Sequence, residues 1–140
     1  MNRPGFTTFE HEADIGIKGW GTSLEEAFAQ AAHAMFSLIR SNVQQLPARY
    51  KIQVHAGGYD LESLFVDWLN SLLAQADLNN LVLCKFDLEI QDLQLAGAAW
   101  GAEQKQDPEQ QGVEVKGATF TELQVVRVQE LWIAQCVVDV

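Results

Sequence analysis

Cations are scarce in this sequence of 140 residues. Nine Lys and Arg stand against nineteen Asp and Glu, which gives a formal net charge of −10. Proteins that hold nucleic acids by their phosphates depend on Lys and Arg, so this composition argues against a chain that grips RNA or DNA unaided. A basic partner or a cation is a better match for such a surface.

Cysteine and long apolar runs are also in short supply. The two cysteines, Cys84 and Cys136, lack the spacing of a metal site and are expected as buried free thiols in a reducing compartment. No stretch is apolar for long enough to cross a bilayer. Residues 1–5 lead into no apolar core of the kind that a secretory signal needs. We therefore expect a cytoplasmic protein with no membrane contact.

The chain does contain enough apolar residues to build a folded core. Hydrophobic residues make up 48% of the sequence, far too many for a disordered chain. No internal repeat, low-complexity tract or linker divides it, so we expect a single domain over residues 1–140.

Two segments have the apolar periodicity of amphipathic helices. The first is predicted over residues 22–39, with Thr22 or Ser23 as the capping residue and a glutamate three residues later. The second is predicted over residues 60–79, with Asp60 as its cap. Both are long enough to cover a sheet.

Most of the remaining sequence is predicted as strands. Residues 6–20 are expected to be extended, with Gly19 and Gly21 marking a turn. A loop is expected over residues 104–112 and a hairpin turn at 129–130. Further strands are predicted at residues 50–56, 81–86, 88–95, 113–120, 123–128 and 131–139. This order predicts an α+β fold, in which two helices cover one face of a mainly antiparallel sheet as two layers.

Two acidic residues stand in strand-like surroundings at opposite ends of the chain. Chain ends often lie close together at a domain surface, so Asp14, Asp139 and the carboxylate of Val140 are candidates for one oxygen-rich site. Concentrated negative charge is costly without a cation, and oxygen ligands favour calcium or magnesium over zinc. The alternatives are that Asp14 caps a local turn and that Asp139 is a solvated strand end.

The other polar candidates, His11, Glu12 and Lys116, have weaker evidence for a functional role. His11 lies three residues before Asp14, where it either orients the acidic site or forms a hydrogen bond within a turn. Glu12 either adds a ligand or faces the other way, because neighbouring strand residues point to opposite sides. Lys116, alone in a predicted strand, is ordinarily a solubilising residue. No histidine has a nucleophile partner and no glycine-rich phosphate loop is present, so no self-contained catalytic set is predicted.

The same segments, taken in order, resemble the archease family. Residues 9–16 read F-E-H-E-A-D-I-G, which is similar to the family's opening F-x-H-T-A-D-I-G. Four more segments resemble later family motifs: S-L-E-E-A-F at 23–28, L-F-V-D-W-L-N-S-L-L at 64–73, V-K-G-A-T-F at 115–120 and V-V-D-V at 137–140. Together they extend over nearly the whole of residues 6–140.

The resemblance implies a function that the residues alone do not. Archeases are non-catalytic cofactors of an RNA ligase that uses GTP and manganese to join RNA ends bearing a 3′-phosphate or 2′,3′-cyclic phosphate, as in tRNA splicing. The resemblance implies that this chain promotes guanylylation of the ligase and its multiple turnover. It also implies that the chain meets RNA only indirectly, through the ligase.

The resemblance also implies which residues act. It places a divalent-cation site, usually holding calcium, at Asp14, Asp139 and Val140, with magnesium or manganese as alternatives. It places the family's functional lysine at Lys116.

Two residues depart from the family pattern. Glu12 replaces a usual Thr, and Thr121 stands where many members have His. Both changes bear on partner contact, for which His11 and Glu12 are the neighbouring candidates.

Two other classes stay open. A general protein-interaction or chaperone-like module agrees with the negative charge and with the lack of a catalytic set. A metal-dependent hydrolase that uses Asp14 and Asp139 ranks lower, because the sequence contains no evident base or pocket signature.

Overall fold

The computed structural model describes residues 3–140. Met1 and Asn2, which begin the segment where no secretory signal is expected, lie outside the described residues. The elements follow one another as β1 (Gly5–His11), β2 (Asp14–Gly21), α1 (Leu24–Ile39), η1 (Val43–Gln45), β3 (Tyr50–Gly57), α2 (Leu61–Asn79), β4 (Leu81–Gln91), β5 (Gln94–Glu103), β6 (Gly117–Ala118), β7 (Gln124–Val128) and β8 (Leu131–Asp139).

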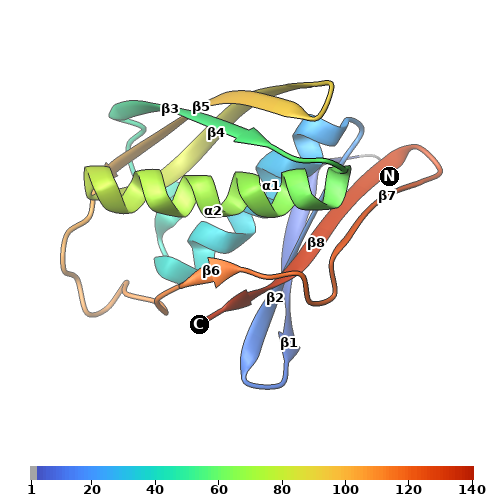
Figure 1. The fold of residues 1–140 in the computed structure, drawn as a ribbon. Helices are drawn as coiled ribbons and strands as arrows, with labels where there is room; N and C mark the ends of the chain where they lie inside the picture. The colour runs from blue at the N-terminus through green and yellow to red at the C-terminus, as the bar shows by residue number, and fades with distance from the viewer. Residues whose placement is uncertain (1–2) are drawn as a thin grey trace.

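The strands form two antiparallel sheets, with the two helices packed against them (Figure 1). The larger sheet has the order β1-β2-β8, and both β6 and β7 pair with the free edge of β8. The smaller sheet has the order β3-β5-β4. α1 contacts both sheets through β2 and β4, whereas α2 packs mainly on β3. The predicted α+β class is confirmed, although the strands divide into two sheets rather than one.

Both helices begin at the predicted caps. The Ser23 hydroxyl accepts a hydrogen bond from the Glu26 N–H at 3.1 Å at the start of α1. α2 starts with a capping box, in which Asp60 accepts from the Ser63 N–H at 2.8 Å. The helices meet in one hydrophobic core to which both sheets contribute. There the buried Trp68 indole of α2 donates a hydrogen bond to a carbonyl of α1.

Residues 6–20 are extended as predicted except at residues 12–13, where an unpredicted turn divides them into two strands. β1 and β2 are the arms of a hairpin, and the chain turns at Glu12, whose φ is 54°. Gly19 and Gly21 lie within β2 instead of marking a turn. A Cβ on Gly19 would lie 2.2 Å from the backbone nitrogen of Ala31. The missing side chain thus allows α1 to pack directly on the strand.

Two other strand predictions differ from the structure. β4 continues without a break to Gln91, and the chain turns at Asp92-Leu93, where both residues have positive φ. In residues 113–120, only Gly117–Ala118 pair with another strand. The N–H of Val113 instead donates to a carbonyl at the end of α1 at 2.8 Å, because the last helical carbonyls lack partners within the helix. The predicted loop over 104–112 and the turn at 129–130 are confirmed.

Both cysteines are free thiols, as predicted. Cys136 is buried, and burial raises the pKa of its thiol to about 12. Cys84 is only half-buried, and burial raises the pKa of its thiol as well. Neither of the two helices in residues 3–140 combines the length and apolarity that a membrane span requires.

One histidine is packed inside this framework. The His33 ring of α1 contacts Phe86 edge-on with centroids 4.9 Å apart and stacks on Phe6 at 6.1 Å. Its Nδ1 lies 3.4 Å from the amide nitrogen of Gln44. Burial lowers the pKa of His33 from its ordinary value, so the folded protein favours the neutral ring.

Stability should therefore depend on pH through His33. As the pH falls below about 6.5, the unfolded chain binds a proton more readily than the partly buried ring does, so the free energy of unfolding should fall. The limit for one proton is about 1.4 kcal/mol per pH unit. Urea unfolding between about pH 6.5 and about pH 5 should show a shallower decline for His33→Gln than for the native chain. His55→Gln, which changes an exposed ring of β3, is the matched control. Equal slopes for the native chain and His33→Gln would contradict this account.

Candidate functional site

Pairing of β2 with β8 brings the two acidic residues together. Their register joins Ile15 to Val138 and Gly16 to Val137. One step further, Asp14 and Asp139 occupy adjacent positions on the same face of the sheet, because side chains alternate along each strand. Figure 1 shows the C-terminus beside β2 and β6. The two chain ends themselves do not meet, although the sequence predicted that they would. Gly5, at the start of β1, pairs with Trp20, which pairs with Ile133 at the start of β8, so the chain begins at the other end of the sheet from Asp139. Asp14 lies beside the C-terminus because the β1–β2 hairpin turns there.

Hydrogen bonds tie this corner to its neighbours. The N–H of Val140 donates to Oδ1 of Asp14 at 3.3 Å. The N–H of Lys116 donates to the main-chain oxygen of Asp139 at 2.8 Å, and Gly117 pairs with Asp139 in the sheet. Backbone hydrogen bonds, and not only side chains, therefore hold this corner together at Asp14, Asp139, Val140 and Lys116.

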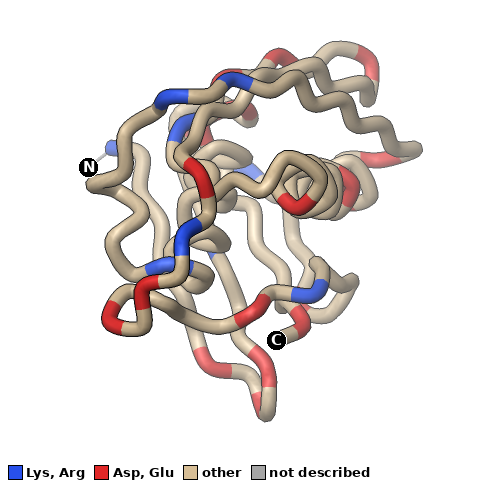
Figure 2. Tube along the Cα trace, turned by 90° about the vertical axis from the view of Figure 1, so that its left-hand side faces the viewer, with Lys and Arg blue, Asp and Glu red and all other residues tan. Residues whose placement is uncertain are grey.

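The hairpin adds a histidine and a glutamate at the same end of the sheet. His11 lies opposite Asp14 in the β1–β2 pairing. Its Nε2, however, is 3.9 Å from a carboxylate oxygen of Glu122, on the loop before β7. Glu12 occupies the exposed turn. Figure 2 shows several acidic segments and a basic one close to the C-terminus.

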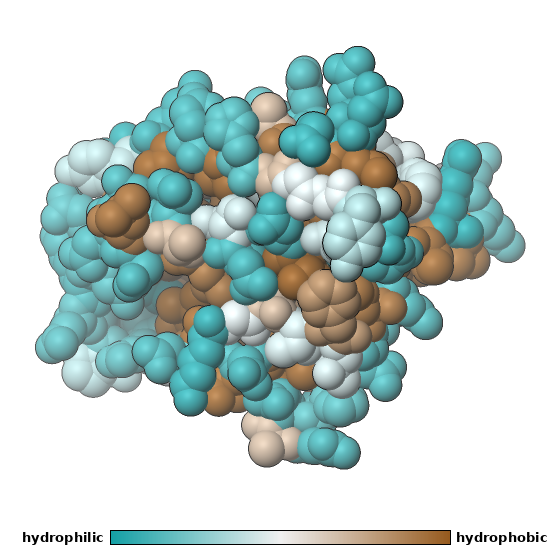
Figure 3. Space-filling view, viewed as in Figure 1, coloured by the Kyte–Doolittle hydropathy of each residue, from teal (hydrophilic) through white to brown (hydrophobic). Residues whose placement is uncertain are grey.

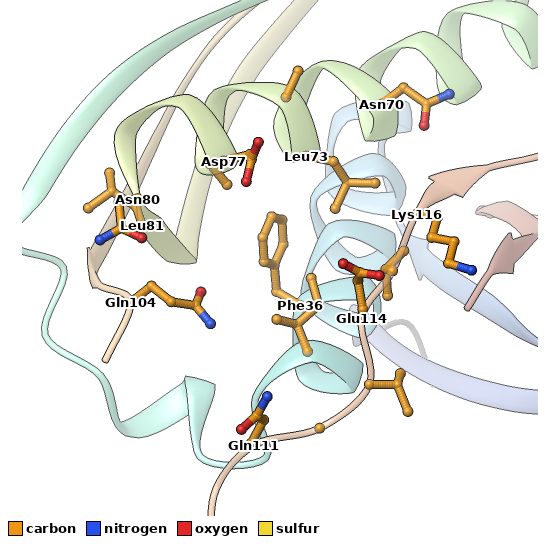
Figure 4. Close-up of a pocket in the computed structure, with 16 residues that line it drawn as sticks. Phe36, Asn70, Leu73, Asp77, Asn80, Leu81, Gln104, Gln111, Glu114 and Lys116 are labelled. Atoms are coloured by element: carbon orange, nitrogen blue, oxygen red, sulfur yellow. The ribbon is translucent and has the colours of Figure 1, made fainter. Parts of the chain in front are cut away.

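Lys116 leaves its ammonium group available at this corner. The residue is exposed. Lys116 is one of the residues that line the neighbouring cavity, and its ammonium group points outward in Figure 4. The ion pairs found among residues 3–140 are His11–Glu122 and Arg40–Asp107, and neither includes Lys116. An unneutralised cation beside carboxylates is suited to contact an anionic group on a partner.

Asn70 of α2 holds the strand that carries this lysine. Its side-chain oxygen accepts from the Ala118 N–H at 2.8 Å, and its amide donates to the Ala118 carbonyl at 3.3 Å. The second helix is therefore joined to β6 by two hydrogen bonds, in which the Asn70 amide is once donor and once acceptor. This pairing of residues 48 positions apart follows from the tertiary structure.

A cavity of about 850 Å³ lies between α2 and the segment that leads to Lys116. Phe36, Leu73 and Leu81 contribute apolar surface, and hydrophobic residues are visible between hydrophilic ones below α2 in Figure 3. Asp77 and Glu114 face the cavity from two sides (Figure 4). Neither Asp14 nor Asp139 lines it.

The donors at the acidic corner fit an oxygen-preferring cation better than zinc. Asp14 and Asp139 contribute carboxylates on one face, and Val140 lies in hydrogen-bond contact with Asp14. Among the described residues, no three His, Cys, Asp or Glu side chains group closely enough to hold a metal ion. A cation here would thus bind two side chains and an oxygen of Val140, with water completing its shell.

Sequence reasoning missed two residues around this corner. Glu122 was not singled out, although its carboxylate lies near His11. Phe120 was expected inside a strand but lies beyond β6 and is 62% exposed, although Thr119 and Thr121 on either side of it still form hydrogen bonds with Val137 of β8. The alternation of apolar residues could not reveal either position, since both depend on the path of the loop before β7.

This architecture defines a class of protein: a small α+β domain in which the second and last strands pair and form an acidic corner beside an exposed lysine. The chain belongs to the archease family, since the archease protein family (MTH1598/TM1083) matches residues 6–140.

Relatives along the whole length agree with this assignment. The chain is 37% identical to protein archease of Saccharolobus solfataricus, over 96% of this chain and 98% of the relative. It is 38% identical to protein archease of Pyrococcus furiosus, over 94% of this chain and 96% of the relative.

Solved structures have the same fold. Methanobacterium thermoautotrophicum protein 1598 superposes with a TM-score of 0.84 at 32% identity, over 97% of this chain and 99% of the other. An archease from Thermotoga maritima, described as a possible chaperone, has a TM-score of 0.62 at 17% identity and covers 100% of this chain and 98% of its own. At that identity the likeness concerns the fold alone.

Removing the Asn70 amide should destabilise the corner. Asn70→Ala leaves the N–H and carbonyl of Ala118 without their partner, which typically costs about 1–3 kcal/mol for groups shielded from water. Urea unfolding measures the loss, and hydrogen exchange should show faster exchange of the Ala118 amide. Asn79→Ala is the control, because the exposed Asn79 amide bonds only within α2. A loss no larger than that of the control would show that the amide pair does not anchor β6.

Proposed function

We propose that this archease is a non-catalytic activator of a GTP-dependent RNA ligase that joins ends with a 3′-phosphate or 2′,3′-cyclic phosphate, as in tRNA splicing. It promotes guanylylation of the ligase and its multiple turnover through a divalent cation. The observation that carries the proposal is the juxtaposition of Asp14 and Asp139 by the β2–β8 register in a chain of this family.

The cation is held by Asp14, Asp139 and an oxygen of Val140. Two carboxylates on one face repel each other unless a positive charge lies between them. An all-oxygen donor set suits calcium first, with magnesium or manganese as alternatives. A bound divalent ion would present a positive centre to the phosphates of the guanylylation reaction.

The surroundings of the cation site supply contacts for the ligase. Lys116 extends from the adjoining strand without an ion-pair partner among the described residues. Phe120 exposes an aromatic ring two residues after β6, and aromatic side chains are enriched in protein interfaces. His11 and Glu12, on the neighbouring hairpin, complete this docking surface. In this arrangement the ligase binds the RNA ends, and the archease acts on the ligase.

A hydrolase that uses the two acids is a poorer match. A hydrolytic site needs a concave pocket in which substrate meets the catalytic groups. The 850 Å³ cavity is lined by neither Asp14 nor Asp139. The archease-named relatives also point to an accessory protein.

A chaperone-like interaction module is the second candidate. The Thermotoga maritima relative is described as a possible chaperone. Tyr59, Leu78 and Phe120 are 82%, 78% and 62% exposed and offer apolar contacts. Such residues scattered singly are normal on soluble proteins, however, so this candidate ranks below the ligase activator.

Calcium should stabilise the protein through Asp14 and Asp139. Binding to the folded state alone adds about 2.7 kcal/mol when the free ion is at about 100 times its dissociation constant. Thermal unfolding with and without calcium should show a rise in the melting temperature of the native chain. Asp14→Asn and Asp139→Asn should lose that rise.

The same variants should be no less stable than the native chain in a chelator, because each substitution relieves carboxylate repulsion. Asp87→Asn, an exposed acid of β4, is the control that keeps the calcium response. An undiminished calcium response in both Asp14→Asn and Asp139→Asn would exclude the site.

Ligase turnover should depend on the same corner. In a reconstituted ligation with limiting ligase, GTP and manganese, the native chain should raise the number of turnovers. Asp14→Ala, Asp139→Ala and Lys116→Ala should return the reaction to that of the ligase alone, because each removes a charged group presented to the partner. Lys105→Ala, in the exposed loop after β5, should stimulate normally.

Stimulation by all three site variants at the native level would refute the activator proposal. Capture of many unfolded clients without any effect on the ligase would instead favour the chaperone-like module.

A further inference from the structure

A tryptophan lies between two lysines on the outer face of the β3-β5-β4 sheet. Trp100 of β5 pairs with Lys51 on β3 and with Lys85 on β4. Both ammonium groups lie over the indole, 5.5 Å from the ring centroid for Lys51 and 4.6 Å for Lys85. The three side chains form one row across the sheet, outside the acidic corner.

The surroundings of this row are open and carry another cation. Arg49 is exposed two residues before Lys51, and its N–H continues the pairing with β5 at 3.1 Å. Along β5, the next residue on the same face as Trp100 is the small Ala98, between Gln53 and Asp87. A flat ligand can therefore lie along the central strand without meeting a bulky side chain.

These cations stand out in an acidic protein. Two of its nine Lys and Arg lie over one indole, and Arg49 is two residues from one of them on the same strand side. Figure 2 shows several basic segments close together in the upper part of the view. None of the ion pairs found among the described residues includes Arg49, Lys51 or Lys85. The acidic residues of this face are Asp87 and Glu89, which follow Lys85 at every second position along β4.

We propose that Arg49, Lys51, Trp100 and Lys85 form a binding platform for single-stranded RNA. The three cations bind successive phosphates, and a base stacks on the indole when one lysine moves from the ring to a phosphate. Unpaired bases expose the faces that an aromatic ring can stack on, whereas a duplex hides them. The Gln53 amide beside Ala98 is both donor and acceptor, as a ribose 2′-hydroxyl requires.

This contact changes the expectation that RNA is met only through the ligase. The net charge of −10 predicts weak overall attraction to phosphates, but the platform concentrates positive charge where a single strand can lie. The inference does not rest on the proposed function, since it concerns the protein alone and a different sheet.

The test is fluorescence anisotropy of labelled octauridylate with the protein alone. Three phosphate contacts predict that log K falls against log salt with a slope of about −2. Trp100→Ala should weaken binding by about fivefold to about a hundredfold through the lost stacking, whereas Trp100→Phe should stay within about threefold of the native chain because it keeps a ring. Circular dichroism verifies that each variant is folded.

The double variant Lys51→Gln/Lys85→Gln should reduce the salt slope by about 1.4, since about 0.7 is lost per phosphate contact. Lys18→Gln/Lys105→Gln makes the same change of charge elsewhere and should leave the slope unchanged. The proposal is overturned if this control lowers binding equally, or if Trp100→Ala binds like the native chain.

Three other ligands test whether the platform prefers single-stranded RNA over a duplex, a DNA strand or an acidic peptide. A hairpin duplex, oligodeoxythymidylate and hexaglutamate should each bind more weakly than octauridylate. Equal binding of any of them would overturn the assignment to single-stranded RNA. Loss of RNA binding in Trp100→Ala is measured without ligase, so its outcome is independent of the turnover assay.

Discussion

The antiparallel pairing of β2 with β8 is the constraint on which the rest of the structure depends. It joins residues 15–21 to residues 132–138, and one step beyond this register Asp14 lies beside Asp139. The same β8 strand pairs on its other edge with β6 and β7, so it also determines where Lys116 emerges. A one-residue slip would turn every side chain of β8 to the other face. Such a slip would remove the fully buried Cys136 and Val138 from the hydrophobic core to which they belong.

Two side-chain arrangements then connect this sheet to the helices. Gly19 lets α1 pack directly against β2, and the Asn70 amide holds β6 against α2. The strands that carry the acidic corner are therefore packed against α1 at β2 and hydrogen-bonded to α2 at β6. The smaller sheet is built from the middle of the chain and presents a different chemistry, with Trp100 between two lysines. One domain thus carries an anionic corner and a separate cationic platform.

Much of the local structure could be predicted because it depends on neighbours in the sequence. The Ser23 and Asp60 caps and the 3.6-residue apolar period are local signals, and both helices begin where these signals place them. The hairpin turn at Glu12 was missed, because a non-glycine residue with positive φ has no strong local signature. The exposure of Phe120 was missed for another reason: the regular strand β6 ends at Ala118, and apolar alternation does not reveal where the chain leaves the regular ladder.

The sequence by itself determined the helices, the strand-rich second half, the free thiols and, through its ordered motifs, membership of the archease family. It also marked Asp14 and Asp139 as candidates. Only the tertiary structure decided that these acids share one face, that the strands divide into two sheets and that Glu122 lies near His11. The physical reason is that sheet register and cross-strand neighbours join residues more than a hundred positions apart, and no local propensity encodes such partners.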